Sequence, residues 1–298
     1  MKQNTVEFKV EMNDVITPLS CSTMINEFIK YVIYQKQLIP YPYERLKMYV
    51  SKRKKQLDSN KETMDELISD KNNRSSKYAL ISHRYFKKTE NAHNLLENIF
   101  QLITDELTVA SYDRVEEVVL LLGSSFTNPQ DIFRLCIPAL DYSHSTKYHS
   151  VQKNCRNLFK TVFNSEQFNN IISNSNCNGS MHIMLKMKSE ISINSQLYIP
   201  RNGFKLPLKG NQTVISFKID NTNTNCLCND FKVFEDNERN SSQSSSASSD
   251  FTYIPDKSIT NSSTNNSDCS WYQIKNTLKY FNDIIIDGTS ITDSWMKP

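Results

Sequence analysis

The feature that most constrains the fold is a helix-forming segment that is apolar on most of its sides. Residues 24–47 read MINEFIKYVIYQKQLIPYPYERLK, which predicts a helix that ends in a turn with two prolines. At about 100° per residue, the outward positions of this helix are few, and they are Asn26, Glu27, Lys30 and Lys36. A helix with so little polar surface is usually central to a domain.

One polar side chain falls on the apolar side of this helix. Gln35 projects into the same sector as Met24, Phe28 and Tyr31. Burial of its amide without hydrogen-bond partners would cost about 1–3 kcal/mol. Two interpretations stay open: a core glutamine whose hydrogen bonds are satisfied, or a residue that another protein covers.

Composition favours one domain with polar insertions over two domains. Apolar residues make up 38% of the 298 residues, and the deficit is concentrated in two stretches. Residues 51–90 are charge-rich and predict a long polar connection with only a weak helical stretch near Met64–Ile68. Residues 221–270 are rich in Asn and Ser, so we expect most of them to be a disordered insertion. The domain therefore spans residues 1–298.

The remaining pattern predicts an α+β fold, with three main helices packed on an antiparallel sheet. A second helix is expected over 95–107 and a third over 149–163, and strands are expected over 115–122, 132–137, 182–187, 214–219 and 271–281. We interpret 123–130 as a hairpin loop, although Asn128-Pro129 also suits a helix start. A further hairpin is predicted across Asn202-Gly203.

The third helix carries two phenylalanines beside its buried stripe. The stripe is expected to contain Val151, Cys155, Leu158 and Val162, with Arg156 and Lys160 on the opposite side. Phe159 and Phe163 project onto the shoulder of that stripe. They belong either to a wide core face or to an aromatic pair offered to a partner, since aromatic anchors carry much of the energy of protein interfaces.

The chain carries no recognisable catalytic, cofactor or metal motif. Five glycines are not spaced to cradle a phosphate, five histidines lack metal-ligand spacing, and Cys226-x-Cys228 has no second cysteine pair. A net charge of +3 without aromatic-basic stripes argues against nucleic acid. No leader or 18-residue apolar run is present, which argues against secretion and membranes. We expect a non-enzyme, with a divergent enzyme as an alternative.

Several segments resemble the comet protein family, HORMA-domain adaptors that bind the mitotic-arrest-deficient-two checkpoint protein. The first-helix block is the most specific, and the others agree with it in order along the chain. The matching segments are 33–47 (IYQKQLIPYPYERLK), 119–123 (VLLLG), 156–163 (RNLFKTVF), 199–206 (IPRNGFKL) and the aromatic stretch 271–281.

The resemblance implies a single closed HORMA domain with a C-terminal safety-belt segment. It further implies a non-catalytic adaptor that docks on the closed checkpoint protein and presents it to a HORMA-remodelling AAA+ ATPase, so that the mitotic checkpoint is silenced. Such a protein would reside in nucleus and cytoplasm and associate with spindle and kinetochores. By motif, Gln35 and Phe159 would face the partner, and by position Phe163 and Arg156 would extend that surface.

One part of the family pattern is missing. The charged ATPase contact of the family precedes the Val-Pro turn, but Ile193-Asn194-Ser195 has neither its proline nor its lysine. The ATPase-binding residues are therefore not transferred. A HORMA adaptor of another pathway, the meiotic axis or autophagy, is the alternative within the same fold.

Overall fold

The computed structural model describes residues 4–12, 14–59, 74–108, 114–140, 142, 149–174, 179–188, 196–219 and 269–296. The Asn/Ser-rich insertion up to residue 268, the stretch Met64–Ile68, the segment 193–195 and Cys226-x-Cys228 lie outside these residues.

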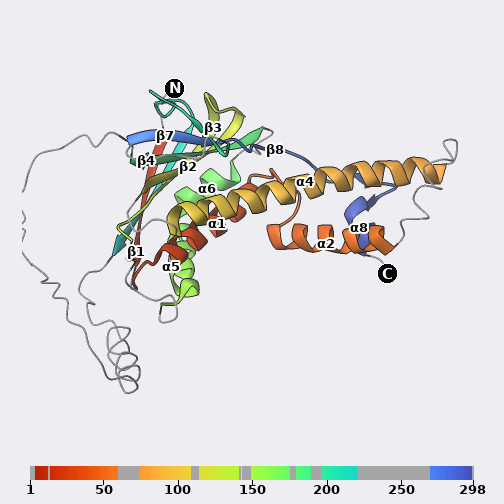
Figure 1. The fold of residues 1–298 in the computed structure, drawn as a ribbon, viewed down its shortest axis with the longest axis horizontal. Helices are drawn as coiled ribbons and strands as arrows, with labels where there is room; N and C mark the ends of the chain where they lie inside the picture. Colours follow the sequence, from red (N-terminus) through yellow and green to blue (C-terminus); the bar gives the residue numbers. More distant parts are fainter. Residues whose placement is uncertain are drawn as a thin grey trace, which may run out of the picture.

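One large mixed sheet forms the framework (Figure 1). Its strand order is β1-β6-β3-β2-β4-β7-β5, and β8 pairs with β4. The strands are β1 (Asn4–Met12), β2 (Val115–Ser125), β3 (Asn128–Cys136), β4 (Ser180–Lys188), β5 (Tyr198–Pro200), β6 (Asn211–Ile219), β7 (Cys269–Ile274) and β8 (Leu278–Lys279). Two further short strands, β9 (Ile285–Ile286) and β10 (Thr289–Ser290), pair with each other.

The expectation of a purely antiparallel sheet is wrong. Strands β1 and β3 both run parallel to β6, while β2, β4, β7 and β5 are antiparallel neighbours. The missing element in the sequence interpretation is β1, where Phe8, Val10 and Met12 are buried in strict alternation with exposed residues. The hairpin of β2 and β3 is confirmed, but its turn consists of Phe126 and Thr127, since residues 123–125 and 128–130 of the predicted loop belong to the two strands.

Six helices are described instead of three. They are α1 (Pro18–Gln35), α2 (Tyr43–Ser59), α4 (Arg74–Thr108), α5 (Val151–Phe163), α6 (Glu166–Ser173) and α8 (Ile291–Met296). The predicted polar connection over 51–90 is therefore wrong in its described parts, which belong to α2 and to the first half of α4. Residues 51–59 of α2 contain no buried side chain, and residues 77–90 of α4 bury few apolar side chains, chiefly Tyr85 and Phe86, so the average composition of these parts is polar.

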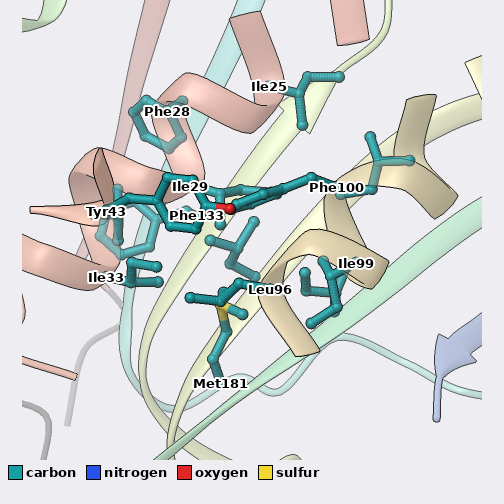
Figure 2. Close-up of a cluster of buried hydrophobic side chains, with 14 of the residues drawn as sticks. Ile25, Phe28, Ile29, Ile33, Tyr43, Leu96, Ile99, Phe100, Phe133 and Met181 are labelled. Carbon is teal, nitrogen blue, oxygen red and sulfur yellow. The ribbon is translucent and has the colours of Figure 1, made fainter. Parts of the chain in front are cut away.

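Helix α1 lies in the core, as its sequence predicts (Figure 2). Thr17 caps its first turn by accepting a hydrogen bond from the amide of Ser20. Its buried side chains pack between the sheet and α4, in a cluster that includes Ile25, Phe28, Ile29, Ile33, Leu96, Ile99, Phe100 and Phe133. The helix ends at Gln35 because Lys36 is its C-cap and Gln37 has a φ of 57°.

The other face of the sheet has a small core of its own. Val119, Leu121, Ile132 and Met184 form it, and they are packed against Phe126, Phe204, Leu206 and Trp271. The predicted hairpin across Asn202-Gly203 is wrong. Gly203 does sit in a turn with φ 71°, but β5 pairs with β7 and residues 204–206 form no strand. The side chains after the turn cover the sheet instead, because its central strand β2 is buried on both faces.

The C-terminal segment runs from the sheet to the first half of α4 (Figure 1). The amide of Phe281 donates to the carbonyl of Leu38 at 3.2 Å, and the hydroxyl of Tyr41 donates to Asp283 at 2.5 Å. Trp295 of α8 is almost fully buried against the rings of Tyr85 and Phe86. None of the helices in the described part of the chain combines the length and apolar character needed to cross a membrane.

Candidate partner-binding surface

Helices α1 and α5 meet in a cluster of three aromatic rings. The ring centroid of Tyr31 lies 5.9 Å from that of Phe159 and 4.9 Å from that of Phe163, and the two phenylalanine rings are 5.2 Å apart. Phe168 of α6 stacks on Tyr31 from inside at 6.3 Å and is itself fully buried. The rings therefore form a continuous path from the core to the surface.

The sequence of α5 sets the depth of these rings. Ser150 caps the helix by accepting from the amide of Lys153, and Leu158 and Val162 are completely buried. Phe159 and Phe163 consequently lie at the edge of the buried stripe, the first half-buried and the second 43% exposed. An exposed phenylalanine supported by other rings is typical of a binding anchor.

Gln35 lies on the surface and is not a core glutamine. Along the same side of α1, Met24 and Phe28 are completely buried, Tyr31 is half-buried, and Gln35 is exposed. This side of the helix thus becomes exposed toward its C-terminal end, while Val32 and Ile33 on its other side stay completely buried. Gln35 follows Tyr31 by one turn, which places it on the same side of α1 as the ring that contacts both phenylalanines.

The residue after Gln35 overturns an expectation, because Lys36 is not an outward position. Its side chain is completely buried, and its Nζ lies 2.8 Å from Oδ2 of Asp131, which is equally buried. The same Nζ donates to the carbonyls of Ile171 and Asn174 at 2.6 and 3.0 Å. At about 100° per residue, Lys36 falls between Val32 and Ile29, which are both completely buried, so its assignment to the outward positions was wrong.

This buried lysine fixes the end of α1 against the rest of the fold. Asp131 belongs to β3, while the two carbonyls lie at the C-terminal end of α6, where the helix dipole favours a positive charge. Asn211 of β6 adds a hydrogen bond of 3.1 Å to the same carboxylate. Lys36 therefore holds Gln35 at a set position relative to the sheet. The sequence prediction missed this burial because lysine is rarely buried without a partner, and its partner Asp131 is distant in the sequence.

The rim of this surface is cationic and polar. Arg156, with Lys153 and Lys160 on the same helix, is exposed beside the aromatic rings. We call Tyr31, Gln35, Arg156, Phe159 and Phe163 the partner face. Burial raises the pKa of the Tyr31 phenol, so that group stays neutral in the physiological range. The face is thus suited to binding by apolar contact and hydrogen bonds.

The partner face contains no combination of groups arranged for chemistry on a substrate. Its titratable members are a tyrosine and an arginine, without an adjacent base or nucleophile. Among the residues with described positions, no three His, Cys, Asp or Glu side chains gather as metal ligands would.

Comparison with known proteins identifies relatives of this chain. A family model named p31comet, described as Mad1 and Cdc20-bound-Mad2 binding, matches residues 9–235, more than half of the chain, and includes α1 and α5. The human MAD2L1-binding protein is 20% identical over 196 residues, which make up 66% of this chain and 64% of the human protein. The chain therefore spans slightly less than two thirds of the length of this curated relative.

Proposed function

Because this chain belongs to the p31comet family, we propose that it is a non-catalytic adaptor that binds the closed conformer of the spindle checkpoint protein Mad2. The family description and the name of the human relative both point to this partner. The proposal places the contact on the partner face.

The observation that carries this proposal is the grouping of the partner face on two helices. Two features singled out in the sequence, Gln35 and the Phe159–Phe163 pair, come from segments more than 100 residues apart. Tyr31 joins them, since it contacts both rings and precedes Gln35 by one turn. An exposed aromatic anchor with a neighbouring amide and a charged rim is the usual composition of an interface centre.

We further propose that the domain is a HORMA domain in its closed form, with residues 269–296 as its safety belt. Support comes from the path of this segment, which pairs β7 with β4 and continues through β8 to α8. The hydrogen bonds of Tyr41 with Asp283 and of Tyr49 with Asp293 fasten it to the turn after α1 and to α2.

The same proposal includes a second partner and a cellular role. A HORMA-remodelling AAA+ ATPase would receive the bound checkpoint protein, which would silence the mitotic checkpoint, in nucleus and cytoplasm and at spindle and kinetochores. These steps follow from the family resemblance. Residues 193–195, where the family places its charged ATPase contact, lie outside the described residues.

The test is conformer selectivity. The full chain is mixed with Mad2 locked in the closed form or locked in the open form, and each mixture is analysed by gel filtration. We expect co-elution with the closed form alone. Co-elution with neither form, or with both equally, would contradict the proposal.

The alternative is an adaptor for another HORMA pathway, such as the meiotic axis or autophagy. Meiotic members use a closure peptide on a free tail, and residues 291–296 are not such a peptide, since they form α8 and pack on α2 and α4. A pull-down that recovers axis or autophagy components without Mad2 would favour this alternative.

A further inference from the structure

The first half of α4 presents a line of exposed positive charges. Lys77, Arg84 and Lys88 are all exposed, and at about 100° per residue they fall within about 40° of one another around the helix. At about 1.5 Å rise per residue they extend over about 16 Å. Lys87 is exposed nearby. We call Lys77, Arg84 and Lys88 the α4 stripe.

These charges are not neutralised within the described part of the molecule. Other lysines, such as Lys30, Lys36 and Lys186, form ion pairs with carboxylates. No ion pair between described residues includes a member of the α4 stripe. The Lys88 ammonium lies 5.6 Å from the ring centroid of Phe281. A row of cations without carboxylate partners among the described residues produces a positive potential that attracts an acidic partner.

Two apolar side chains border the α4 stripe. Leu80 and Ile81 are 36% and 38% exposed and lie on either side of the line of charges. The opposite side of α4 is occupied, because Tyr85 and Phe86 pack on Trp295. The helix therefore offers one face that combines apolar borders with a cationic centre.

The α4 stripe is far from the partner face. Helix α1 contacts α4 where Asn26 donates to the carbonyl of Phe100 and to Thr104. Arg84 precedes Phe100 by sixteen residues, or about 24 Å along the helix. Figure 1 shows the first half of α4 extending away from the sheet beside α2 and α8. Both surfaces can therefore be occupied at once.

We propose that the α4 stripe is a second docking surface, which binds an acidic amphipathic segment of another protein. The charges require an acidic ligand, and the apolar borders favour one with leucine-like side chains between its carboxylates. Nucleic acid fits less well because the described residues of this face include no exposed aromatic side chain for base stacking. A membrane surface fits less well because, among side chains whose burial is described, this face exposes two large apolar ones, Leu80 and Ile81. The inference does not depend on Mad2 binding.

The test uses the full chain and a fluorescently labelled helical peptide with glutamates at positions i, i+7 and i+11 and leucines between them. Binding is followed by anisotropy at low and at elevated salt. We expect saturable binding that weakens with salt and falls about tenfold in Lys77→Glu/Arg84→Glu, since two attractive charges are replaced by repulsive ones.

The matched control is Lys54→Glu/Lys55→Glu, which changes the net charge equally on the exposed side of α2. It should bind the peptide within about twofold of the parent chain. Both variants should keep the parent thermal midpoint. The proposal is overturned if the parent does not bind the peptide, or if the two variants weaken it equally. The proposal is also overturned if the chain binds duplex DNA or phosphatidylserine vesicles at a lower concentration than the peptide, and if that binding is lost in Lys77→Glu/Arg84→Glu.

Discussion

The two halves of α4 are one continuous helix in two different environments. Its second half buries Leu96, Ile99 and Ile103 against α1 and the sheet, in the main core. Its first half packs on α2 and the C-terminal segment, where the rings of Tyr85 and Phe86 contact Trp295, and its outer side carries the α4 stripe.

The comparison shows that apolar periodicity identifies a helix, whereas the elements packed around the helix determine how many of its residues are apolar. The second half has a wide apolar face because two layers cover it. The first half needs only a narrow apolar stripe, since α2 and the C-terminal segment pack against one side of it, and its remaining positions can contact solvent or a partner. We call the first half of α4 with α2 and α8 the outer lobe.

The largest effect is expected at the core end of the molecule, from Lys36→Met. The substitution leaves the completely buried Asp131 without its ion-pair partner. Loss of one member of a buried pair typically costs about 3–5 kcal/mol, so we expect the free energy of unfolding in urea to fall by about 4 kcal/mol.

The control for this variant is Lys36→Met/Asp131→Asn, which leaves no buried charge. It should recover at least half of the lost stability, since a neutral pair carries no uncompensated charge. If the free energy of unfolding of Lys36→Met falls by less than about 1 kcal/mol, the ion pair of Lys36 with Asp131 does not fix the end of α1.

The outer lobe is tested by Trp295→Ala. Removal of a buried tryptophan costs about 3–5 kcal/mol, and we expect about 3 because the site is peripheral. Amide hydrogen exchange should lose protection in α2 and in residues 77–90, while β2 and residues 95–107 keep theirs. Equal loss in both halves of α4 would contradict the distinction drawn between them.

Gln35→Ala should have a much smaller effect on the fold. The side chain is exposed at the end of α1, and we expect a change below about 0.5 kcal/mol in unfolding free energy. Binding to closed Mad2 should weaken at the same time. A stability loss of several kcal/mol in urea titration would restore the core-glutamine interpretation.

The smallest effect concerns acid sensitivity of the sheet. Burial lowers the pKa of His182, and the nearby Arg201 charge lowers it further. The unfolded chain then binds a proton near pH 6.5 while the folded chain does not, so stability falls as pH drops below about 6.5. The thermal midpoint of the parent chain should be lower at pH 5.5 than at pH 7, and this difference should be slightly smaller in His182→Gln. If the difference is the same in both proteins, His182 does not contribute to the acid sensitivity.

Elements with a strong local pattern were predictable from the sequence. Helix α1, the β2–β3 hairpin, β4 and α5 all have apolar periodicity that local propensity and packing support. The outer lobe was missed because its buried stripe is narrow and its sequence is charge-rich. Strand β1 was missed although its alternation was visible, and its parallel pairing with β6 depends on contacts distant in the sequence.

The candidate site was predicted in part for the same reasons. The positions of Phe159 and Phe163 on the shoulder of α5 follow from helical geometry, and the structure brings both against Tyr31. The burial of Lys36 depends on Asp131 and on the end of α6, which local pattern cannot locate. Whether the partner face binds Mad2 stays a prediction.

The most direct test of that prediction is an isothermal titration of closed Mad2 into Phe163→Ala. The control is Met48→Ala, which truncates an equally exposed apolar side chain on α2. Loss of an aromatic anchor costs about 2 kcal/mol or more, so Phe163→Ala should weaken binding about thirtyfold or more, while Met48→Ala leaves it unchanged. Equal affinity in the two variants would contradict the assignment of the partner face.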